Sequence, residues 1–303
     1  MNIIGHRRIW YAISLLLIVP GLISLFTSGL KLGIDFTGGA QLEVKGVASA
    51  SSISTASSGL GFADLTVVSG GTNDWLIQYR DTAPPSQVEA DHQRFLAKLQ
   101  PLGLQEVQFS NVGPSVSRDI ARSAILSVLV ASIAIVLYIA FAFRNVPPPA
   151  SSWSFGAAAI AALLHDAFFV LGAFSLLGHF FHVEVDSLFV TAVLTVIGFS
   201  VHDTIVVFDR IRENLRRERK SFEAIVNDSI LETLARSINT SMTVLLTLLA
   251  LYLFGGASIK NFILALLLGI ASGTYSSIFN ASPLLVTWHN HKLKKLAKAQ
   301  AAA

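Results

Sequence analysis

Cysteine is missing from the 303-residue chain, so disulfides, thiolate metal sites and thiol nucleophiles are excluded. Charge is also scarce: Asp, Glu, Lys and Arg make up 14% of the residues, whereas hydrophobic residues make up 52%. A soluble domain of this length rarely has such a composition, so the sequence predicts an integral membrane protein. The net charge of only +3 says little about partners. We expect a lipid bilayer and no nucleic acid among them.

Six apolar segments are each long enough to cross a bilayer as a helix, which takes about 20 residues. They are approximately Ile9–Phe26, Ile120–Phe143, Trp153–Leu177, Leu188–Phe208, Ser237–Phe254 and Ile259–Trp288. A secretory signal is the alternative for the first segment, which follows His6, Arg7 and Arg8. Its apolar core is longer than that of a signal peptide, and no clear cleavage pattern follows, so we expect a retained span.

Basic residues gather on one side of these segments. They are Arg7, Arg8, Arg144, the cluster 210–220, and Lys292, Lys294, Lys295 and Lys298. The short loops on the other side contain Lys260 and little else that is basic. By the positive-inside rule, both termini are expected in the cytoplasm, and residues 31–118 are expected to form one extracytoplasmic domain.

This extracytoplasmic segment shows the order strand, weak helix, strand, strand, helix, strand. The expected elements are Ile34–Lys45, Ala48–Gly59, Leu65–Ser69, Trp75–Arg80, Pro85–Leu99 and Leu104–Phe109. The βαββαβ order predicts a small ferredoxin-like domain. The expected fold class is therefore an α-helical polytopic membrane protein with six transmembrane helices and one small α+β domain. The domain contains no catalytic triad, metal cluster or phosphate loop.

The chain is thus expected to divide into six parts. They are 1–30 with the first span, the domain 31–118, 119–208 with spans two to four, a charged cytoplasmic link 209–235, 236–288 with the last two spans, and a basic tail 289–303. Four apolar residues of the link share one helical face: Phe222, Ile225, Val226 and Ile230. With Ser221 as N-cap, they favour an interfacial helix lying along the membrane. The Ala-rich tail is expected to be disordered at its end.

Two acidic residues fall inside the predicted spans. Asp203 lies six residues before Asp209, which is roughly 9 Å up the helix at ~1.5 Å per residue. Asp166 lies within the third span, and the two acids directly follow His202 and His165, respectively. A carboxylate at such a depth costs a few kcal/mol by insertion scales, so each acid needs a partner or a function.

Four spans carry small or polar residues at helical spacing. The stripes are Ala158, Ala162 and Asp166; Thr191, Thr195, Gly198 and His202; Arg236, Thr240, Thr243 and Thr247; and Gly269, Gly273, Ser276 and Asn280. Such stripes can be packing seams, and Arg236 can snorkel to the membrane surface. If they face inward, however, they gather two acids, two histidines and a series of hydroxyls in one place.

A proton pathway is the function that such a cluster favours. Its expected residues are Asp203, Arg236, Asp166, His165, His202 and Thr240. Low-dielectric surroundings favour the neutral form of a carboxyl group, whereas a nearby guanidinium favours the charged form. A displacement of Arg236 would therefore switch Asp203 between binding and releasing a proton, with the other groups in support.

Several motifs in this order resemble the SecD/SecF family of bacterial protein-export membrane proteins, and its SecF members in particular. The motifs are GIDFTGG at 33–39, NVGP at 111–114, HD at 165–166, GFSVHDT at 198–204, FDRIREN at 208–214, RSINTS at 236–241, GTYSSIF at 273–279 and SP at 282–283. Each block is weak alone, but the ordered set is specific and runs nearly from end to end.

The resemblance implies a fold like one half of an RND transporter in the bacterial cytoplasmic (inner) membrane, with SecD as the other half. It implies the SecYEG channel and a YajC-like accessory subunit as partners, and unfolded preprotein on the outer side. Late, ATP-independent export would be driven by the proton motive force, with no cofactor. The functional acid and arginine of the family fall on Asp203 and Arg236. The motif residues Asp35, Gly38 and Gly39 are expected to have a structural role at the membrane exit.

One position departs from the family. The family usually has Asn directly before the aspartate of the fourth span, and here His202 could join the relay or fill the same space. Two other functions are open: half of a proton-coupled RND-type small-molecule exporter, and a passive scaffold whose buried charges fix helix register. Residues 31–118 are too few for a deep drug pocket, which disfavours the exporter. An enzyme is least expected, because the spacing suggests no nucleophile–base pair.

Overall fold

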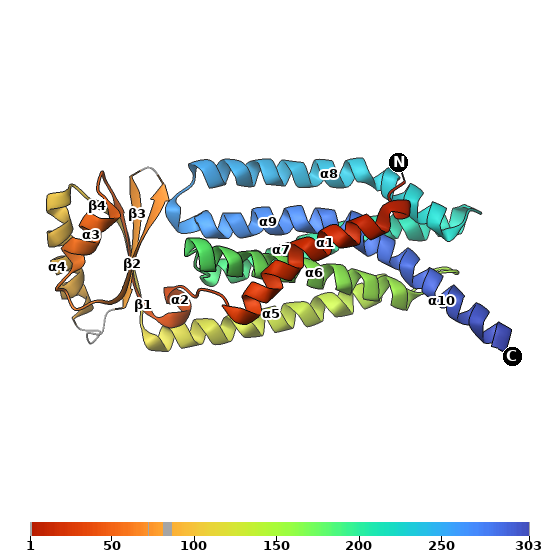
Figure 1. The fold of residues 1–303 in the computed structure, drawn as a ribbon, viewed down its shortest axis with the longest axis horizontal. Coiled ribbons are helices and arrows are strands. Elements are labelled where there is room, and N and C mark those ends of the chain that lie inside the picture. Colours follow the sequence, from red (N-terminus) through yellow and green to blue (C-terminus); the bar gives the residue numbers. More distant parts are fainter. Residues whose placement is uncertain (1, 72, 81–86, 303) are drawn as a thin grey trace.

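The computed structural model describes residues 2–71, 73–80 and 87–302. Long helices form an elongated bundle, and a small sheet domain lies at one end of it (Figure 1). Both ends of the chain lie at the opposite end of the bundle (Figure 1).

Six helical segments among the described residues are long and apolar enough to cross a membrane. They are built from α1 (Arg7–Thr27), α5 (Pro114–Ala142), α6 (Ser152–Phe181), α7 (Ser187–Arg217), α8 (Phe222–Phe254), and α9 (Lys260–Ser276) continued by α10 (Ser282–Ala302). Single 3-10 turns lie at Ile4–His6 (η1), Gln100–Leu102 (η2) and Ala257–Ile259 (η3). Each predicted span lies within one of these segments or passes its end by one residue, so the six-span prediction is confirmed.

The sixth segment changes direction part of the way along. A π turn, η4 (Ser277–Ala281), separates α9 from α10, and the two helices point in different directions (Figure 1). Pro283 follows this turn, and a proline in a regular helix would clash with the carbonyl of the residue four positions earlier. The π turn and the bend are the usual responses to such a residue.

The sheet domain follows the predicted βαββαβ order. Its elements are β1 (Gly39–Lys45), α3 (Ala50–Ser57), β2 (Ala63–Gly71), β3 (Asp74–Arg80), α4 (Val88–Leu99) and β4 (Gln105–Val112). The strands are antiparallel in the order β2-β3-β1-β4, and both helices cover the sheet face that points away from the bundle (Figure 1). Leu42, Ile77, Ile53, Phe95 and Leu99 are almost completely buried between the two layers. The ferredoxin-like prediction is confirmed.

The first predicted strand was too long. Ile34–Thr37 forms a short helix, α2, and β1 begins only at Gly39. Gly38 has φ of 75° and Gly39 has φ of 139°, a backbone region that residues with a Cβ rarely adopt. The two glycines therefore break the chain between helix and strand, and the predicted strand Ile34–Lys45 is wrong over its first five residues.

The separate interfacial helix in the link was also wrong. Ser221 is the N-cap, as predicted, and its hydroxyl accepts the N–H of Ala224. From there α8 continues without a break to Phe254, because no glycine or proline interrupts it. The face formed by Phe222, Val226 and Ile230 is buried in the core of the bundle rather than against a membrane surface.

The tail differs from its prediction as well. α10 continues as a helix to Ala302, and its part from Lys292 to Gln300 is exposed, whereas the sequence predicts disorder at the end of the chain. Alanine, lysine and leucine dominate residues 292–302, and all three are strong helix formers.

Candidate functional site

Asp166 lies at the point where α6, α7 and α9 meet, and its side chain is fully buried. Oδ2 accepts the hydroxyls of Ser200 and Ser276, each at 2.5 Å. Oδ1 accepts the hydroxyl of Ser272 at 2.7 Å and lies 3.0 Å from Nδ1 of His165. Hydrogen bonds to a charged group contribute about 1.5–3 kcal/mol each. Asp166 therefore fastens three membrane helices to one another.

Two glycines of α9 make this arrangement possible. A Cβ at Gly269 would overlap the side chain of Val196 on α7, and a Cβ at Gly273 would lie 3.1 Å from Cβ of Ser200. The predicted stripe Gly269–Gly273–Ser276 is therefore a close packing seam. It brings Ser272 and Ser276 within reach of the Asp166 carboxylate.

Asp203 is buried as well, but it is held more loosely. Its side chain is 2% exposed, and the hydroxyl of Ser241 on α8 donates to Oδ2 across a long distance of 3.4 Å, with the Thr274 hydroxyl on α9 also interacting with the carboxylate. The hydroxyl of Thr274 on α9 donates to Ser241 at 2.6 Å. Asp203 thus ends a chain of hydroxyls across α7, α8 and α9. A carboxyl group with so few donors has spare capacity to bind a proton.

The polar groups around this chain are incompletely paired. Among the described residues, the buried hydroxyls of Thr204 and Ser237 have no hydrogen-bond partner. Thr204 follows Asp203 on α7, and Ser237 lies one helical turn before Ser241 on α8. Unpaired buried hydroxyls are uncommon, and they occur where polar groups or water exchange partners.

Two of the four predicted stripes face outward instead of inward. Thr191, Thr195, Gly198 and His202 on α7 are exposed, and so are Arg236, Thr240, Thr243 and Thr247 on α8. Arg236 forms no hydrogen bond or ion pair with Asp203 in the part of the chain that the structure describes, and the Thr240 hydroxyl bonds to the carbonyl of Arg236. Successive helical residues differ by about 100°. Ser237 and Ser241 therefore face the core, and Arg236 and Thr240 do not.

Sequence reasoning missed several residues of this site. Ser200, Ser272, Ser241 and Thr274 all bond to the buried acids or to their partners. A signal was present in two cases, because Ser237 and Ser241 on α8, and Ser272 and Ser276 on α9, recur at a spacing of four.

Asp35 joins the short helix α2 to the start of α7. Its Oδ2 accepts both the N–H of Ser187, at 2.8 Å, and the Ser187 hydroxyl. The carboxylate thus lies at the positive N-terminal end of α7. Next to it, Asp186 caps α7 by accepting the N–H of Phe189 at 2.8 Å. Burial raises the pKa of Asp186, although this hydrogen bond partly offsets the rise.

Gly38 and Gly39 follow α2, which contains Asp35, directly in the sequence. A Cβ at Gly39 would lie 2.9 Å from the carbonyl oxygen of Tyr79 on β3. The motif therefore turns the chain sharply from α2 into β1 where the sheet domain meets the bundle. This geometry fits a structural role for Asp35, Gly38 and Gly39.

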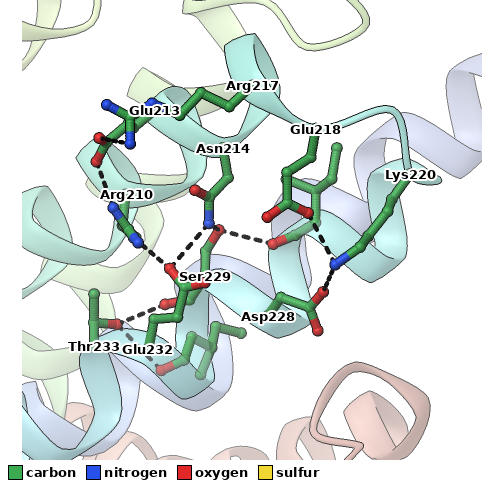
Figure 2. Close-up of polar contacts among 12 residues, drawn as sticks. Arg210, Glu213, Asn214, Arg217, Glu218, Lys220, Asp228, Ser229, Glu232 and Thr233 are labelled. Atoms are coloured by element: carbon green, nitrogen blue, oxygen red, sulfur yellow. Dashed lines mark hydrogen bonds and ion pairs between the residues drawn. The ribbon is translucent and has the colours of Figure 1, made fainter.

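A polar cluster fixes the other end of the α7–α8 hairpin (Figure 2). The buried Asn214 donates to Ser229 at 3.0 Å and to Glu232 at 3.1 Å. Arg210 pairs with both Glu213 and Glu232. These contacts set the register of the two helices that carry Asp203 and Ser241.

Beyond α7, Lys220 bridges Asp228 at 2.8 Å and Glu218 at 3.0 Å (Figure 2). Hydrogen bonds to these two carboxylates raise the pKa of Lys220. In the described ranges of the chain, no group of three or more His, Asp or Glu side chains is arranged to hold a metal ion.

Comparison with known proteins gives a consistent match. The family model described as "Protein export membrane protein SecD/SecF, C-terminal" matches residues 92–291, and the one described as "SecD/SecF GG Motif" matches residues 23–47. The chain is 50% identical to the protein translocase subunit SecF of Thermobaculum terrenum, over 96% of this chain and 94% of that protein. It is 42% identical to the SecF of Anaerolinea thermophila, with the same two coverages.

A solved structure agrees. The chain superimposes on SecDF from Thermus thermophilus, described as a translocon-associated membrane protein, with a TM-score of 0.81 and 34% identity. This match covers 96% of the chain but only 39% of SecDF, so the chain spans about two fifths of that protein. These relatives are translocase subunits, which does not favour the small-molecule exporter.

Six apolar helices and these relatives identify a multi-pass membrane protein with a role in protein export. The GG-motif match includes Gly38 and Gly39, where the backbone turns into the sheet domain. The chain belongs to the SecD/SecF family of protein-export membrane proteins.

Proposed function

We propose that this chain is the SecF half of a two-part unit that uses the proton motive force to assist late, ATP-independent steps of preprotein export. The observation that carries the proposal is the contrast between two buried acids. Among the described residues, Asp166 accepts three hydroxyls at 2.5–2.7 Å and lies 3.0 Å from Nδ1 of His165, whereas the Ser241 hydroxyl reaches Asp203 only at 3.4 Å, with Thr274 beside it. Asp203 is therefore the group that can gain and lose a proton without dismantling the bundle.

Energy is sufficient for such a cycle. A membrane potential supplies about 2.3 kcal/mol per charge per 100 mV, and each pH unit adds about 1.4 kcal/mol. One proton that crosses through Asp203 can thus drive a change of several kcal/mol. His165 and Asp166 support this carrier by holding α6, α7 and α9 in place.

A SecD-type partner is the second element of the proposal. The outward stripes of α7 and α8 place His202, Arg236 and Thr240 on the surface of a membrane-spanning bundle, where contact with lipid is costly. A second helical half that covers these stripes removes that cost. Two relatives support this proposal. SecDF of Bacillus subtilis matches 96% of this chain with 38% of its own length, and SecDF of Thermus thermophilus matches 96% of this chain with 39% of its own length.

In this arrangement Arg236 lies at the seam between the two halves. Motion of one half against the other would bring its guanidinium toward Asp203 or remove it, and so would switch the charge of the acid. His202 occupies the same seam, and it can take part in the proton path from there. We place the SecYEG channel and a YajC-like subunit as further partners, and unfolded preprotein as the substrate of the sheet domain.

Orientation follows from charge. The basic groups near the chain ends and near the α7–α8 hairpin support a proposed orientation in the bacterial inner membrane with both termini in the cytoplasm. The sheet domain, at the other end of the bundle, then lies outside the membrane, where translocated polypeptide emerges.

The test is proton-dependent translocation with the SecD partner present. Asp203→Asn should preserve copurification with SecD but abolish the part of preprotein export that a proton gradient adds. Ser28→Ala, which changes an exposed hydroxyl of the chain at the end of α1, serves as the matched control. Undiminished gradient-dependent export by Asp203→Asn would remove Asp203 from the mechanism.

A further inference from the structure

An apolar groove opens beside α5, close to the sheet domain. It has a volume of about 470 Å³, and every residue that lines it is apolar. Phe36 of α2 lies at one end, Ala124, Ile125 and Val128 of α5 form one wall, and Phe189 and Val193 of α7 form another. The volume falls in the range of small-ligand sites, which is about 300–1,000 Å³.

The helix that forms the outer wall is only loosely attached to the bundle. Between Ser117 and Ile139, no residue of α5 is buried. Ile125 is 65% exposed and Leu129 is 55% exposed, although both line the groove. α5 lies on the side of the bundle opposite α8 (Figure 1).

Two arginines continue the apolar stripe of α5 toward the sheet domain. Arg118, Arg122, Ile125 and Leu129 follow one another at spacings of four, three and four, so they share one helical face. Side chains on a helix point back toward its N-terminus. The guanidinium of Arg122 therefore extends from the groove toward the sheet domain.

These two cations have no acidic partner. Arg122 makes no hydrogen bond or ion pair with any described residue, and Arg118 donates only to the carbonyl of Pro114. The nearby Lys31 is already paired with Glu184 at 3.4 Å. Asp119, three residues before Arg122, forms no ion pair with it among the described residues and lines a neighbouring cavity that shares Ala124 and Val190 with the groove.

The depth of Arg122 matches a lipid headgroup. Residues 123–143 carry no charge and lie between Arg122 and Arg144. At ~1.5 Å per residue they span about 31 Å, which is close to the ~30 Å of a bilayer's hydrocarbon core. Arg122 therefore lies at the membrane surface, and the groove lies in the hydrocarbon directly below it.

We propose that this groove holds one acyl chain of an anionic phospholipid, whose phosphate binds Arg122 and Arg118. The apolar lining suits a hydrocarbon chain and offers no partner to a polar ligand, whereas an arginine fork suits a phosphate. The acyl chain of the lipid would fill the groove beside Phe36, between α2 and α5. These two elements connect the sheet domain to the membrane, so the lipid stabilises the base of that domain.

The full chain is reconstituted with equal amounts of phosphatidylglycerol and phosphatidylethanolamine that carry identical acyl chains, and retained lipid is measured by native mass spectrometry. We expect one retained phosphatidylglycerol per chain, preferred about tenfold, which is the size of one charge-assisted hydrogen bond. Arg122→Gln should remove most of the preference, and Arg122→Lys should restore part of it. Arg144→Gln, at the other end of α5, is the matched control.

A second pair of variants tests the groove itself. Ala124→Phe fills it and should abolish retention of either lipid, whereas Leu126→Phe, which does not line it, should not. Equal retention of the two lipids by the wild type, or unchanged retention by Ala124→Phe, would overturn the proposal. Displacement of the lipid by an apolar peptide would also overturn it, and would assign the groove to polypeptide.

Photocrosslinking keeps the proposal testable if Ala124→Phe does not fold. Phosphatidylglycerol with a photoreactive group on its acyl chain should label peptides that contain Phe36, Ile125 or Phe189 of the wild type. Labelling confined to other helices would contradict the site.

Discussion

Replacing Asp166 by asparagine should destabilise the bundle severely. The asparagine amide keeps one acceptor oxygen, but it has an NH₂ group in the position of the second carboxylate oxygen. Either the pair Ser200 and Ser276, or Ser272 and His165, then loses its acceptor. Two lost bonds to a charged group, at about 1.5–3 kcal/mol each, give a loss of about 3 kcal/mol or more.

The matching change at Asp203 should be nearly silent in stability. The Ser241 bond to this carboxylate is long, at 3.4 Å, and the Thr274 hydroxyl also bonds to Ser241, so Asp203→Asn should cost less than about 1 kcal/mol. At roughly 2–4 °C per kcal/mol, Asp166→Asn should lower Tm by about 6 °C or more, and Asp203→Asn by less than about 4 °C. The two variants are the same chemical change at equally buried sites, so each is the control of the other.

The assay is thermal unfolding of the full chain in one detergent, followed by intrinsic fluorescence and by circular dichroism. An Asp166→Asn variant that melts with the wild type would refute the role of Asp166 as a structural anchor. Equal destabilisation by both variants would refute the difference in their hydrogen bonding, and with it the reason for choosing Asp203 as the proton carrier.

Three further outcomes follow from packing, capping and titration. Gly269→Ala should lower stability by about 1–3 kcal/mol because its Cβ meets Val196, whereas Gly198→Ala, with open space around it, should be neutral or slightly stabilising in thermal melts of the isolated chain. Asn214→Ala should cost about 1–3 kcal/mol, because it leaves buried partners unpaired, and should loosen the α7–α8 hairpin to proteolysis. The raised pKa of Asp186 means that its contribution to stability is present below the ordinary aspartate pKa and is lost as pH rises through the raised value. Asp186→Asn keeps the N-cap but cannot titrate, so the change of Tm with pH in this range should become smaller. A dependence of Tm on pH equal to that of the wild type would contradict the role of Asp186.

Much of the fold could be predicted because its signals are local. Long apolar runs such as Trp153–Leu177 specify spans, and the order of short strands and helices specifies the ferredoxin-like domain. The errors have local causes too. The break at Gly38–Gly39 depends on backbone angles that a pattern of apolar residues does not reveal. The separate interfacial helix was inferred from an apolar face that in fact packs into the bundle.

The site was harder to predict, because periodicity shows which residues share a face but not which way that face points. The stripe of Arg236 and Thr240 and the neighbouring pair Ser237 and Ser241 are both regular. Only the packing of α8 on α7 and α9 decides that the serines face Asp203. The two stripes that were expected to face inward are therefore exposed, and their part in the function stays a prediction.

The most direct measurement is infrared difference spectroscopy of the chain with its SecD partner in vesicles, before and after a proton gradient is imposed. The account predicts a protonated-carboxyl band that changes with the gradient in the wild type, disappears in Asp203→Asn, and persists in any Asp166→Asn protein that remains folded. A gradient-dependent band that is unaltered in Asp203→Asn would contradict the claim that this residue carries the proton.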